Sequence, residues 1–119
     1  MDTKNILKGC IFYAELSPYK GSEQGGCRPV VVVQNDVGNR HSPTIIVAAI
    51  TGKVAQKAKL PTHCCIGTEC GLEMPSVILC EQIRTIDKSR LRKYVGYLNE
   101  TKMSEVNKAL AISLGLPGI

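Results

Sequence analysis

The sequence predicts a mainly β fold, a small and mostly antiparallel β-barrel with short helices and a C-terminal α-helix. Apolar runs rich in β-branched residues recur along the chain, and short segments of turn-forming residues separate them. A helical spacing of apolar residues appears only near the end. With 119 residues, the chain is long enough for one modest core. We therefore expect a single domain over residues 1–119.

The first half of the chain predicts three strands. The run from Val30 to Val33 is continuously apolar, as in a strand buried on both faces. The polar segment 17–27 precedes it, turn chemistry follows at residues 35–39, and a basic loop covers residues 52–59. The strands are expected over residues 11–14, 30–34 and 44–51.

The second half predicts three more strands and the helix. Asp87 is a suitable N-cap for one helical turn over residues 87–91, and residues 67–75 form a turn-rich connection. Asn99 caps the final helix and Gly115 ends it. The strands are expected over residues 62–66, 76–84 and 94–98, the last at a sheet edge. The apolar stripe of the helix consists of Met103, Val106, Leu110 and Leu114.

Charge and composition indicate the kind of partner. The net charge is +5 and the pI is near 9.0, which favours a polyanion. Aromatic residues make up only 4% of the chain, so recognition of nucleic acid should depend on charge and hydrogen bonds rather than on base stacking. No apolar run is long enough to span a membrane, and the N-terminus lacks a signal-peptide pattern. We expect a cytoplasmic protein without a membrane partner.

Six cysteines raise the question of a metal or redox site. The expected reducing compartment favours free thiols, and Cys80 lies within an apolar run that predicts a core position. Cys64, Cys65 and Cys70 with His63 resemble a metal site superficially. They lack paired CxxC spacing, and neighbours in an extended segment point to opposite faces. We expect no metal and no cofactor, and keep a cysteine-based metal or redox module as one alternative.

A glycine-rich loop over residues 21–26 delivers Arg28 to the start of an apolar strand. The glycines allow positive φ and close approach to another molecule. Pro29 restricts the backbone beside Arg28, whose guanidinium is a permanently charged fork. A flexible polar loop beside such a cation suits an anionic ligand such as RNA phosphate. A hairpin loop with a surface arginine is the simpler reading of this segment alone.

Seven blocks of residues together carry a family likeness, in chain order 21–26, 28–29, 34–39, 42–44, 48–51, 57–63 and 81–87. The stretch from residue 9 to residue 116 resembles the MazF/PemK toxins of bacterial toxin–antitoxin systems, most closely those of Gram-positive bacteria. The resemblance implies a homodimer of SH3-like barrels that cuts single-stranded mRNA at a short sequence without a metal. The implied products are a 2′,3′-cyclic phosphate and a 5′-hydroxyl, and a MazE-like antitoxin would block the enzyme.

The resemblance implies that Arg28 and Thr51 are the catalytic residues. As a permanent cation, Arg28 is best suited to stabilise charge on the phosphate, and its part in proton transfer stays open. Thr51 ends a strand, where a hydroxyl can reach a phosphoryl oxygen. Asn35 and Asn39 also suit a turn, and Gln82 also suits a barrel rim. The expected RNA-binding residues are Ser22, Glu23, Gln24, Asn35, Asn39, Lys57 and Gln82.

Three further interpretations remain open. His41 and His63 could form the acid–base pair of a different nuclease. A toxin of the same fold could instead poison DNA gyrase by protein contact and would then not need Arg28. The basic residues of three loops could form a phosphate track if those loops meet on one face. These residues are Lys20, Arg40, Lys53, Lys57 and Lys59.

Overall fold

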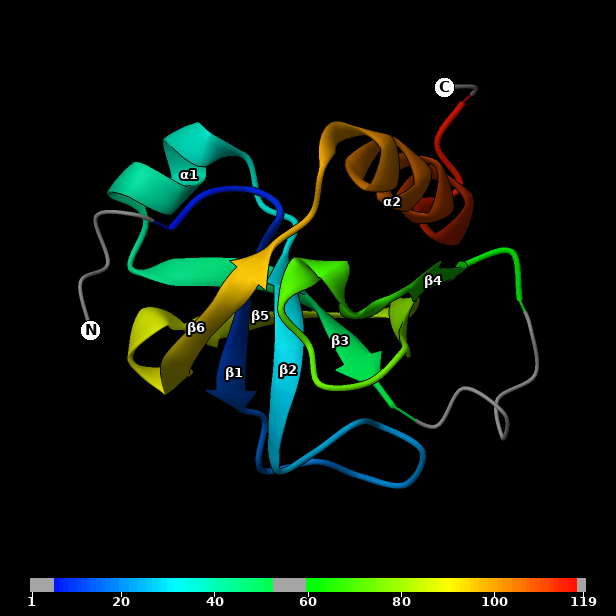
Figure 1. Ribbon diagram of the computed structural model, residues 1–119. Helices are drawn as coiled ribbons and strands as arrows, with labels where there is room; N and C mark the ends of the chain where they lie inside the picture. The colour runs from blue at the N-terminus through cyan, green and yellow to red at the C-terminus, as the bar shows by residue number, and fades with distance from the viewer. Residues whose placement is uncertain (1–5, 53–59, 118–119) are drawn as a thin grey trace.

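The computed structural model describes residues 6–52 and 60–117, and it is a mainly β protein with a C-terminal helix (Figure 1). The strands are β1 (Cys10–Glu15), β2 (Cys27–Val32), β3 (Thr44–Thr51), β4 (His63–Ile66), β5 (Ser76–Asp87) and β6 (Leu91–Tyr97). The helices are α1 (Asp36–His41) and α2 (Glu100–Leu114), with 3₁₀ turns η3 (Thr68–Cys70) and η4 (Lys88–Arg90). The expected fold class is confirmed. No helix in the described residues is long and apolar enough to cross a membrane.

All six strands form one antiparallel sheet in the order β4-β5-β3-β2-β1-β6. Hydrogen bonds between described residues do not close it, so the expected barrel is open between β4 and β6. The short turn η3 packs against β6 at this opening. A Cβ on Gly96 would lie 1.9 Å from the carbonyl oxygen of Cys70, which shows how closely the two backbones approach. Glycine at position 96 permits this contact.

The sheet buries apolar side chains on both faces. Along β2, Val31 packs with Ile11, Ile50 and Ile78 on one side, while Val30 and Val32 pack with a second cluster on the other. This explains why the run has no polar alternation. Members of the second cluster from distant parts of the chain, such as Leu16, Ile86 and Leu91, cover the sheet's other face.

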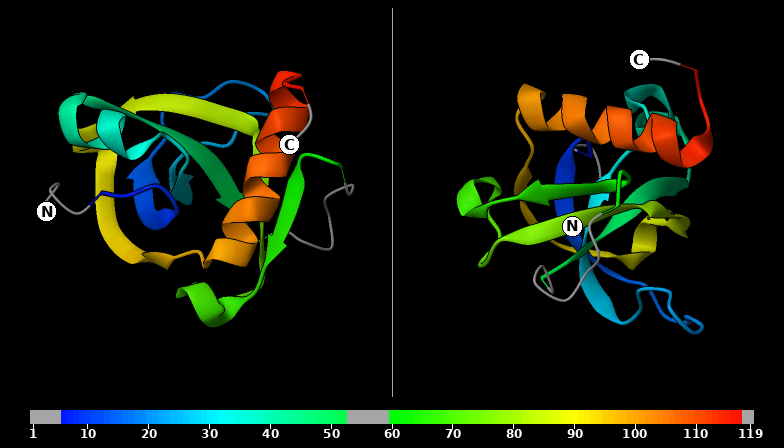
Figure 2. Two further views of the ribbon diagram at one scale, coloured as in Figure 1. Left: turned by 90° about the horizontal axis from the view of Figure 1, so that it is seen from above. Right: turned by 90° about the vertical axis from the view of Figure 1, so that its right-hand side faces the viewer.

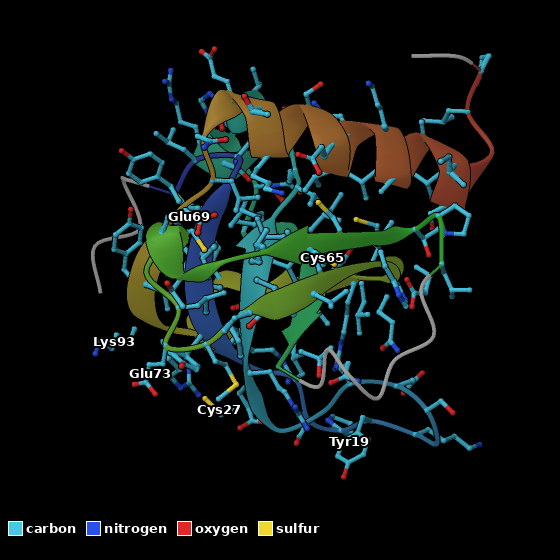
Figure 3. All side chains as sticks on the ribbon, turned by 45° about the vertical axis from the view of Figure 1, so that its right-hand side comes forward. Tyr19, Cys27, Cys65, Glu69, Glu73 and Lys93 are labelled. Atoms are coloured by element: carbon cyan, nitrogen blue, oxygen red, sulfur yellow. The ribbon has the colours of Figure 1, made fainter. Side chains whose placement is uncertain are left out.

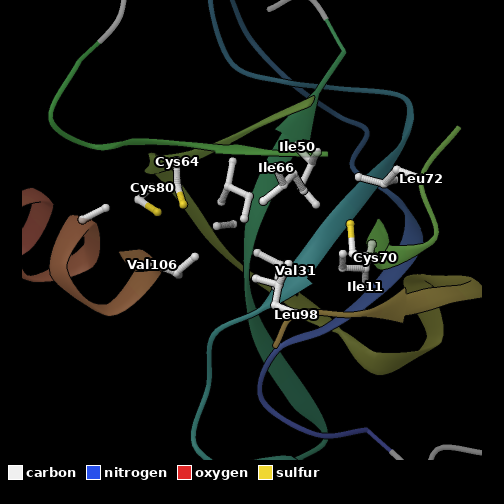
Figure 4. Packing of buried hydrophobic residues seen from close by; sticks show 13 residues of the cluster. Ile11, Val31, Ile50, Cys64, Ile66, Cys70, Leu72, Cys80, Leu98 and Val106 are labelled. Carbon is white, nitrogen blue, oxygen red and sulfur yellow. The ribbon is translucent and has the colours of Figure 1, made fainter. Parts of the chain in front are cut away.

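Helix α2 lies along one side of the sheet and packs against β4 and β5 (Figure 2). Asn99 accepts a hydrogen bond from the Lys102 amide at 2.8 Å, and Gly115 ends the helix with φ of 68°, as expected. Val106 is buried beside Cys64 and Cys80 (Figure 4). The prediction for Leu114 is wrong: it is 60% exposed, because it lies a full turn beyond Leu110, the last helix residue packed on this cluster.

The turn expected at residues 35–39 is instead part of helix α1. Asn35 caps it by accepting a hydrogen bond from the Gly38 amide at 2.8 Å, and Asp36 lies in its first turn. The expected bounds of β2 are also wrong. The hairpin ladder with β1 begins at Cys27, and the amides of Val33 and Gln34 both donate to the Ile46 carbonyl, where regular pairing ends.

Candidate functional site

The loop between β1 and β2 is held by hydrogen bonds at its base and at its tip. The Leu16 amide donates to the Gly26 carbonyl at 2.9 Å, and Glu23 Oε1 accepts from the Lys20 amide at 2.6 Å. Gly21 and Gly26 adopt φ of 58° and 74°, which fits the predicted need for glycine. Hydrogen bonds therefore restrain the loop more than the flexible polar loop that the sequence predicts.

Two arginines that sequence reasoning did not select fix the base of this loop. Arg84, on β5, donates to the carbonyls of Leu16 and Pro18. Arg90, in η4, donates to the carbonyls of Glu15 and Ser17. These partners lie 66 to 75 positions away in the sequence, so no local sequence pattern predicts these hydrogen bonds.

A pocket of about 580 Å³ opens beside the loop. It brings together four of the predicted RNA-binding residues: Ser22, Glu23, Gln24 and Gln82. Its apolar floor includes Val47 and Ala49 of β3. Its remaining lining residues are Leu16, Pro18, Glu81, Ile83 and Arg84.

Gln82 ties the loop to the sheet across this pocket. Its Oε1 accepts from the Gln24 amide at 2.8 Å, and its Nε2 donates to the Ser22 carbonyl at 3.1 Å. Both ends of the amide are thus engaged.

The side chain of Gln24 differs, because its Oε1 is buried and accepts no hydrogen bond from any described residue. A buried acceptor left unpaired costs roughly 1–3 kcal/mol, so this atom is suited to meet a donor from a ligand.

Arg28 and Thr51 are not among the residues that line the pocket, but they lie on β2 and β3 close in the chain to the lining residues Gln24 and Ala49. Arg28 is half-buried, and its Nε donates to the Gly25 carbonyl at 3.0 Å, which orients the guanidinium. The β2–β3 ladder pairs Val30 with Ala49, so extending its register by two residues sets Arg28 opposite Thr51. Strand alternation directs Thr51 to the same face as Ala49, which lines the pocket. Thr51 is only 1% exposed.

The remaining predicted residues lie elsewhere. Asn35 caps α1, and the buried Asn39 bonds Gln34 and Asp36 within the same region. Helix α1 lies at the opposite end of the molecule from the β1–β2 loop (Figures 1 and 2). Arg40, on this helix, therefore does not meet the loop that carries Lys20, so within one chain the condition for a shared phosphate track is not fulfilled for these two residues. Lys53, Lys57 and Lys59 lie outside the described residues.

His63 bonds Glu81 rather than His41. Its Nε2 lies 3.0 Å from Glu81 Oε2, and Thr62 Oγ1 donates to Glu81 Oε1 at 2.9 Å. Partial burial alone would raise the pKa of Glu81, but hydrogen bonds from its own backbone, His63 and Thr62 outweigh that effect and hold the pKa below its ordinary value. His41 ends α1, at the far end of β3 from the partners of His63. The two histidines do not form a pair.

All six cysteines are free thiols. Cys64 is buried and Cys65 exposed, as alternation predicts, and Figure 3 shows Cys65 and Cys27 on the outside. Burial raises the pKa of the Cys80 thiol to about 12, which keeps it protonated in the core. Within residues 6–52 and 60–117, no three His, Cys, Asp or Glu side chains gather as metal ligands would.

Comparison with known proteins places this geometry in a family. Residues 7–114 match the model of the PemK-like, MazF-like toxins of type II toxin–antitoxin systems. The chain is 58% identical, over 93% of its length and 92% of the relative's, to "Endoribonuclease MazF" of Staphylococcus saprophyticus.

Solved structures agree with this match. An endoribonuclease from a mycobacterial species has a TM-score of 0.78 at 25% identity, and it covers 99% of this chain and 100% of its own. A mycobacterial endoribonuclease in complex with its cognate antitoxin has a TM-score of 0.79 at 26% identity, covering 95% and 98%. The chain therefore belongs to the PemK-like, MazF-like toxins of type II toxin–antitoxin systems.

Proposed function

We propose that this toxin cuts single-stranded mRNA at a short sequence, without a metal, in the groove that contains the 580 Å³ pocket. As a MazF-type toxin, the chain is an endoribonuclease. In the proposed reaction the RNA's own 2′-hydroxyl oxygen attacks the adjacent phosphorus and loses its proton. The bond from phosphorus to the 5′-oxygen breaks, and that oxygen gains a proton. The products are a 2′,3′-cyclic phosphate and a 5′-hydroxyl.

The position of Arg28 carries the proposal. Its guanidinium is oriented by the carbonyl of Gly25, which follows directly after Gln24 of the pocket wall. A fixed cation there would stabilise the charge that develops on the phosphoryl oxygens. Thr51 would add a hydroxyl donor. Because Thr51 is buried in this conformation, direct contact with a phosphate requires the groups that cover it to move aside.

The pocket would bind the bases rather than only the backbone. The unpaired Gln24 Oε1 can accept from a base N–H once the groups that bury it move aside, and Ser22 and Glu23 line the same wall. Gln82 would act by holding this wall in place. Asn35 and Asn39 would contribute only through the fold of α1, since their side chains are engaged there. Lys57 remains a proposed phosphate contact.

Incubation of the purified protein with a long single-stranded RNA transcript in EDTA tests this proposal. Mapping of the new 5′ ends should show cuts at one recurring short sequence, each with a 5′-hydroxyl. Arg28→Ala should abolish the cuts while the circular dichroism spectrum and Tm stay close to those of the parent protein. A folded Arg28→Ala protein that still cuts would contradict the assigned role. A folded parent protein that cuts nothing would favour the gyrase-poison alternative.

We also propose that the toxin is a cytoplasmic homodimer neutralised by a MazE-like antitoxin. The support is the family and the solved complex of a mycobacterial relative with its cognate antitoxin. Light scattering after size-exclusion chromatography should give twice the chain mass of 12.9 kDa. A mass equal to one chain at micromolar concentration would contradict the dimer.

A further inference from the structure

A break in the β3–β5 register brings two consecutive polar residues of β5 to the pocket. Ala48 pairs with Ile83, but the next residue, Ala49, pairs with Leu79, so Cys80, Glu81 and Gln82 have no partners on β3. In a regular strand, Glu81 and Gln82 would point to opposite faces. In this bulge both line the pocket, while Cys80 stays buried in the core. Bulges often re-aim side chains beside functional sites.

Glu81 and Gln82 bond to different segments on the two sides of the pocket. Gln82 holds the loop at Ser22 and Gln24. Glu81 is held by donors from the start of β4, with Thr62 Oγ1 on one carboxylate oxygen and His63 Nε2 on the other. The carboxylate of Glu81 is therefore oriented by two side chains that do not themselves line the pocket.

The tautomer of His63 follows from its second contact. The Leu60 amide donates to His63 Nδ1 at 3.3 Å, so this nitrogen is the acceptor of the ring. The proton of neutral His63 then lies on Nε2, which donates to Glu81 Oε2 at 3.0 Å. The side chain of His63 is only 5% exposed, whereas that of Glu81 is 34% exposed. The histidine is thus fixed in the protein, whereas part of the Glu81 side chain is open to solvent.

The carboxylate keeps free acceptor capacity in this position. An ionised carboxylate has about four lone-pair sites, and two are engaged by Thr62 and His63. It cannot donate a hydrogen bond, and it repels phosphate oxygens, so its partner must be a donor other than the phosphate, either a base N–H or a ribose 2′-hydroxyl. A base with an exocyclic amino group is a suitable partner. Uracil is less suitable, because its single N3–H donor lies between two carbonyl oxygens that would face the negative charge.

We propose that Glu81 is a specificity-determining residue that accepts a hydrogen bond from the amino group of one base of the substrate RNA, and that His63 positions it. This inference rests on the proposed function and deepens it. His63 acts through Glu81 and is a positioning residue, with Thr62 in a supporting role. The inference predicts that the recognised sequence contains adenine, cytosine or guanine at one position that Glu81 selects.

Single-base variants of the mapped target sequence test this inference. Each position of a short RNA substrate is replaced in turn by the other three bases, and kcat/KM is measured for the parent protein and for Glu81→Gln. Glu81→Gln should lower kcat/KM for the preferred base at one position by roughly tenfold to a hundredfold, the size of a lost hydrogen bond to a charged group. Discrimination at the other positions should be unchanged.

A substrate analogue identifies the base atom involved. With the parent protein, replacing the preferred base by an analogue without its exocyclic amino group should cause a similar loss. With Glu81→Gln the analogue should cause a smaller loss than with the parent protein, because the charge-assisted hydrogen bond to this amino group has already been weakened. Independent, multiplying losses would overturn the assignment.

His63 variants separate positioning from general stability. His63→Ala should weaken discrimination at the same position, and His63→Gln should restore part of it, since a glutamine amide can donate to Glu81. Glu105→Gln is the matched control, because Glu105 is a carboxylate bonded to Lys102 on α2, away from the pocket. It should leave every substrate ratio unchanged. Thermal unfolding of each variant reports its stability.

The outcomes distinguish this inference from the proposed function. If the parent protein cuts RNA but Glu81→Gln and His63→Ala keep all substrate ratios, the inference is overturned and the proposed function stands. A uniform loss across all positions that follows the drop in Tm would likewise overturn it, since that result indicates a structural role only. If the parent protein cuts no RNA, the proposed function itself fails.

Discussion

Replacement of Gln82 by alanine should weaken RNA cleavage by freeing the loop that forms one wall of the pocket. The side chain makes two hydrogen bonds to this loop, at 2.8 Å to the Gln24 amide and at 3.1 Å to the Ser22 carbonyl. Each hydrogen bond is worth about 1 kcal/mol net, so Gln82→Ala should destabilise the loop conformation that these bonds hold by about 2 kcal/mol. This corresponds to about a 30-fold lower kcat/KM.

The assay compares kcat/KM on one RNA substrate with the free energy of unfolding in urea. Gln34→Ala is the matched control, because Gln34 also uses its amide for two hydrogen bonds, to Asn39 and the Thr44 carbonyl, near α1. It should lower stability without changing kcat/KM by more than about twofold. The reasoning is refuted if Gln82→Ala retains the parent kcat/KM, or if Gln34→Ala reduces it as strongly.

Three other predictions concern the core, the thiols and pH. Ile78→Val, at a fully buried position, should lower the free energy of unfolding by about 0.5–1.5 kcal/mol in urea titration and leave cleavage intact. A thiol reagent should modify only the two exposed cysteines, Cys27 and Cys65, in the native protein and all six after unfolding. The lowered pKa of Glu81 stabilises the folded state above the ordinary glutamate value of about 4.3, and this contribution is lost as the pH falls through the lowered pKa. Glu81→Gln should therefore reduce the drop in Tm between about pH 7 and pH 3, and an unchanged drop would contradict this.

The fold was predictable where local chemistry decides it. The β-branched runs form β2, β3 and β5. As expected, Asp87 caps the start of η4, and Asn99 and Gly115 cap the two ends of α2. Errors arose where tertiary contacts decide. Segment 35–39 carries turn residues that serve equally as a helix cap, so local propensity could not separate a turn from α1. The open edge between β4 and β6 depends on pairings that no local pattern specifies.

The candidate site was predictable in part, and for a different reason. The glycine-rich loop and Arg28 were selected from the residues themselves, while Thr51 and the catalytic roles came through the family resemblance. In the structure the loop lines the pocket, and the register of β2 and β3 sets Arg28 opposite Thr51. Asn39 was selected as a residue whose side chain could bind RNA, but in the structure that side chain is buried and hydrogen-bonded to Gln34. Glu81 was missed because its importance depends on a bulge and on partners 18 and 19 positions away in the sequence.

The bulge in β5 allows one residue, Cys80, to pack in the core while its two neighbours, Glu81 and Gln82, line the pocket. Without it, strand alternation would bury either Glu81 or Gln82, and a buried charge without a partner is costly. With it, Cys80 fills the core while both polar residues reach the pocket. Changes at Glu81 and Gln82 should therefore alter recognition more than stability, whereas changes at Cys80 should do the reverse.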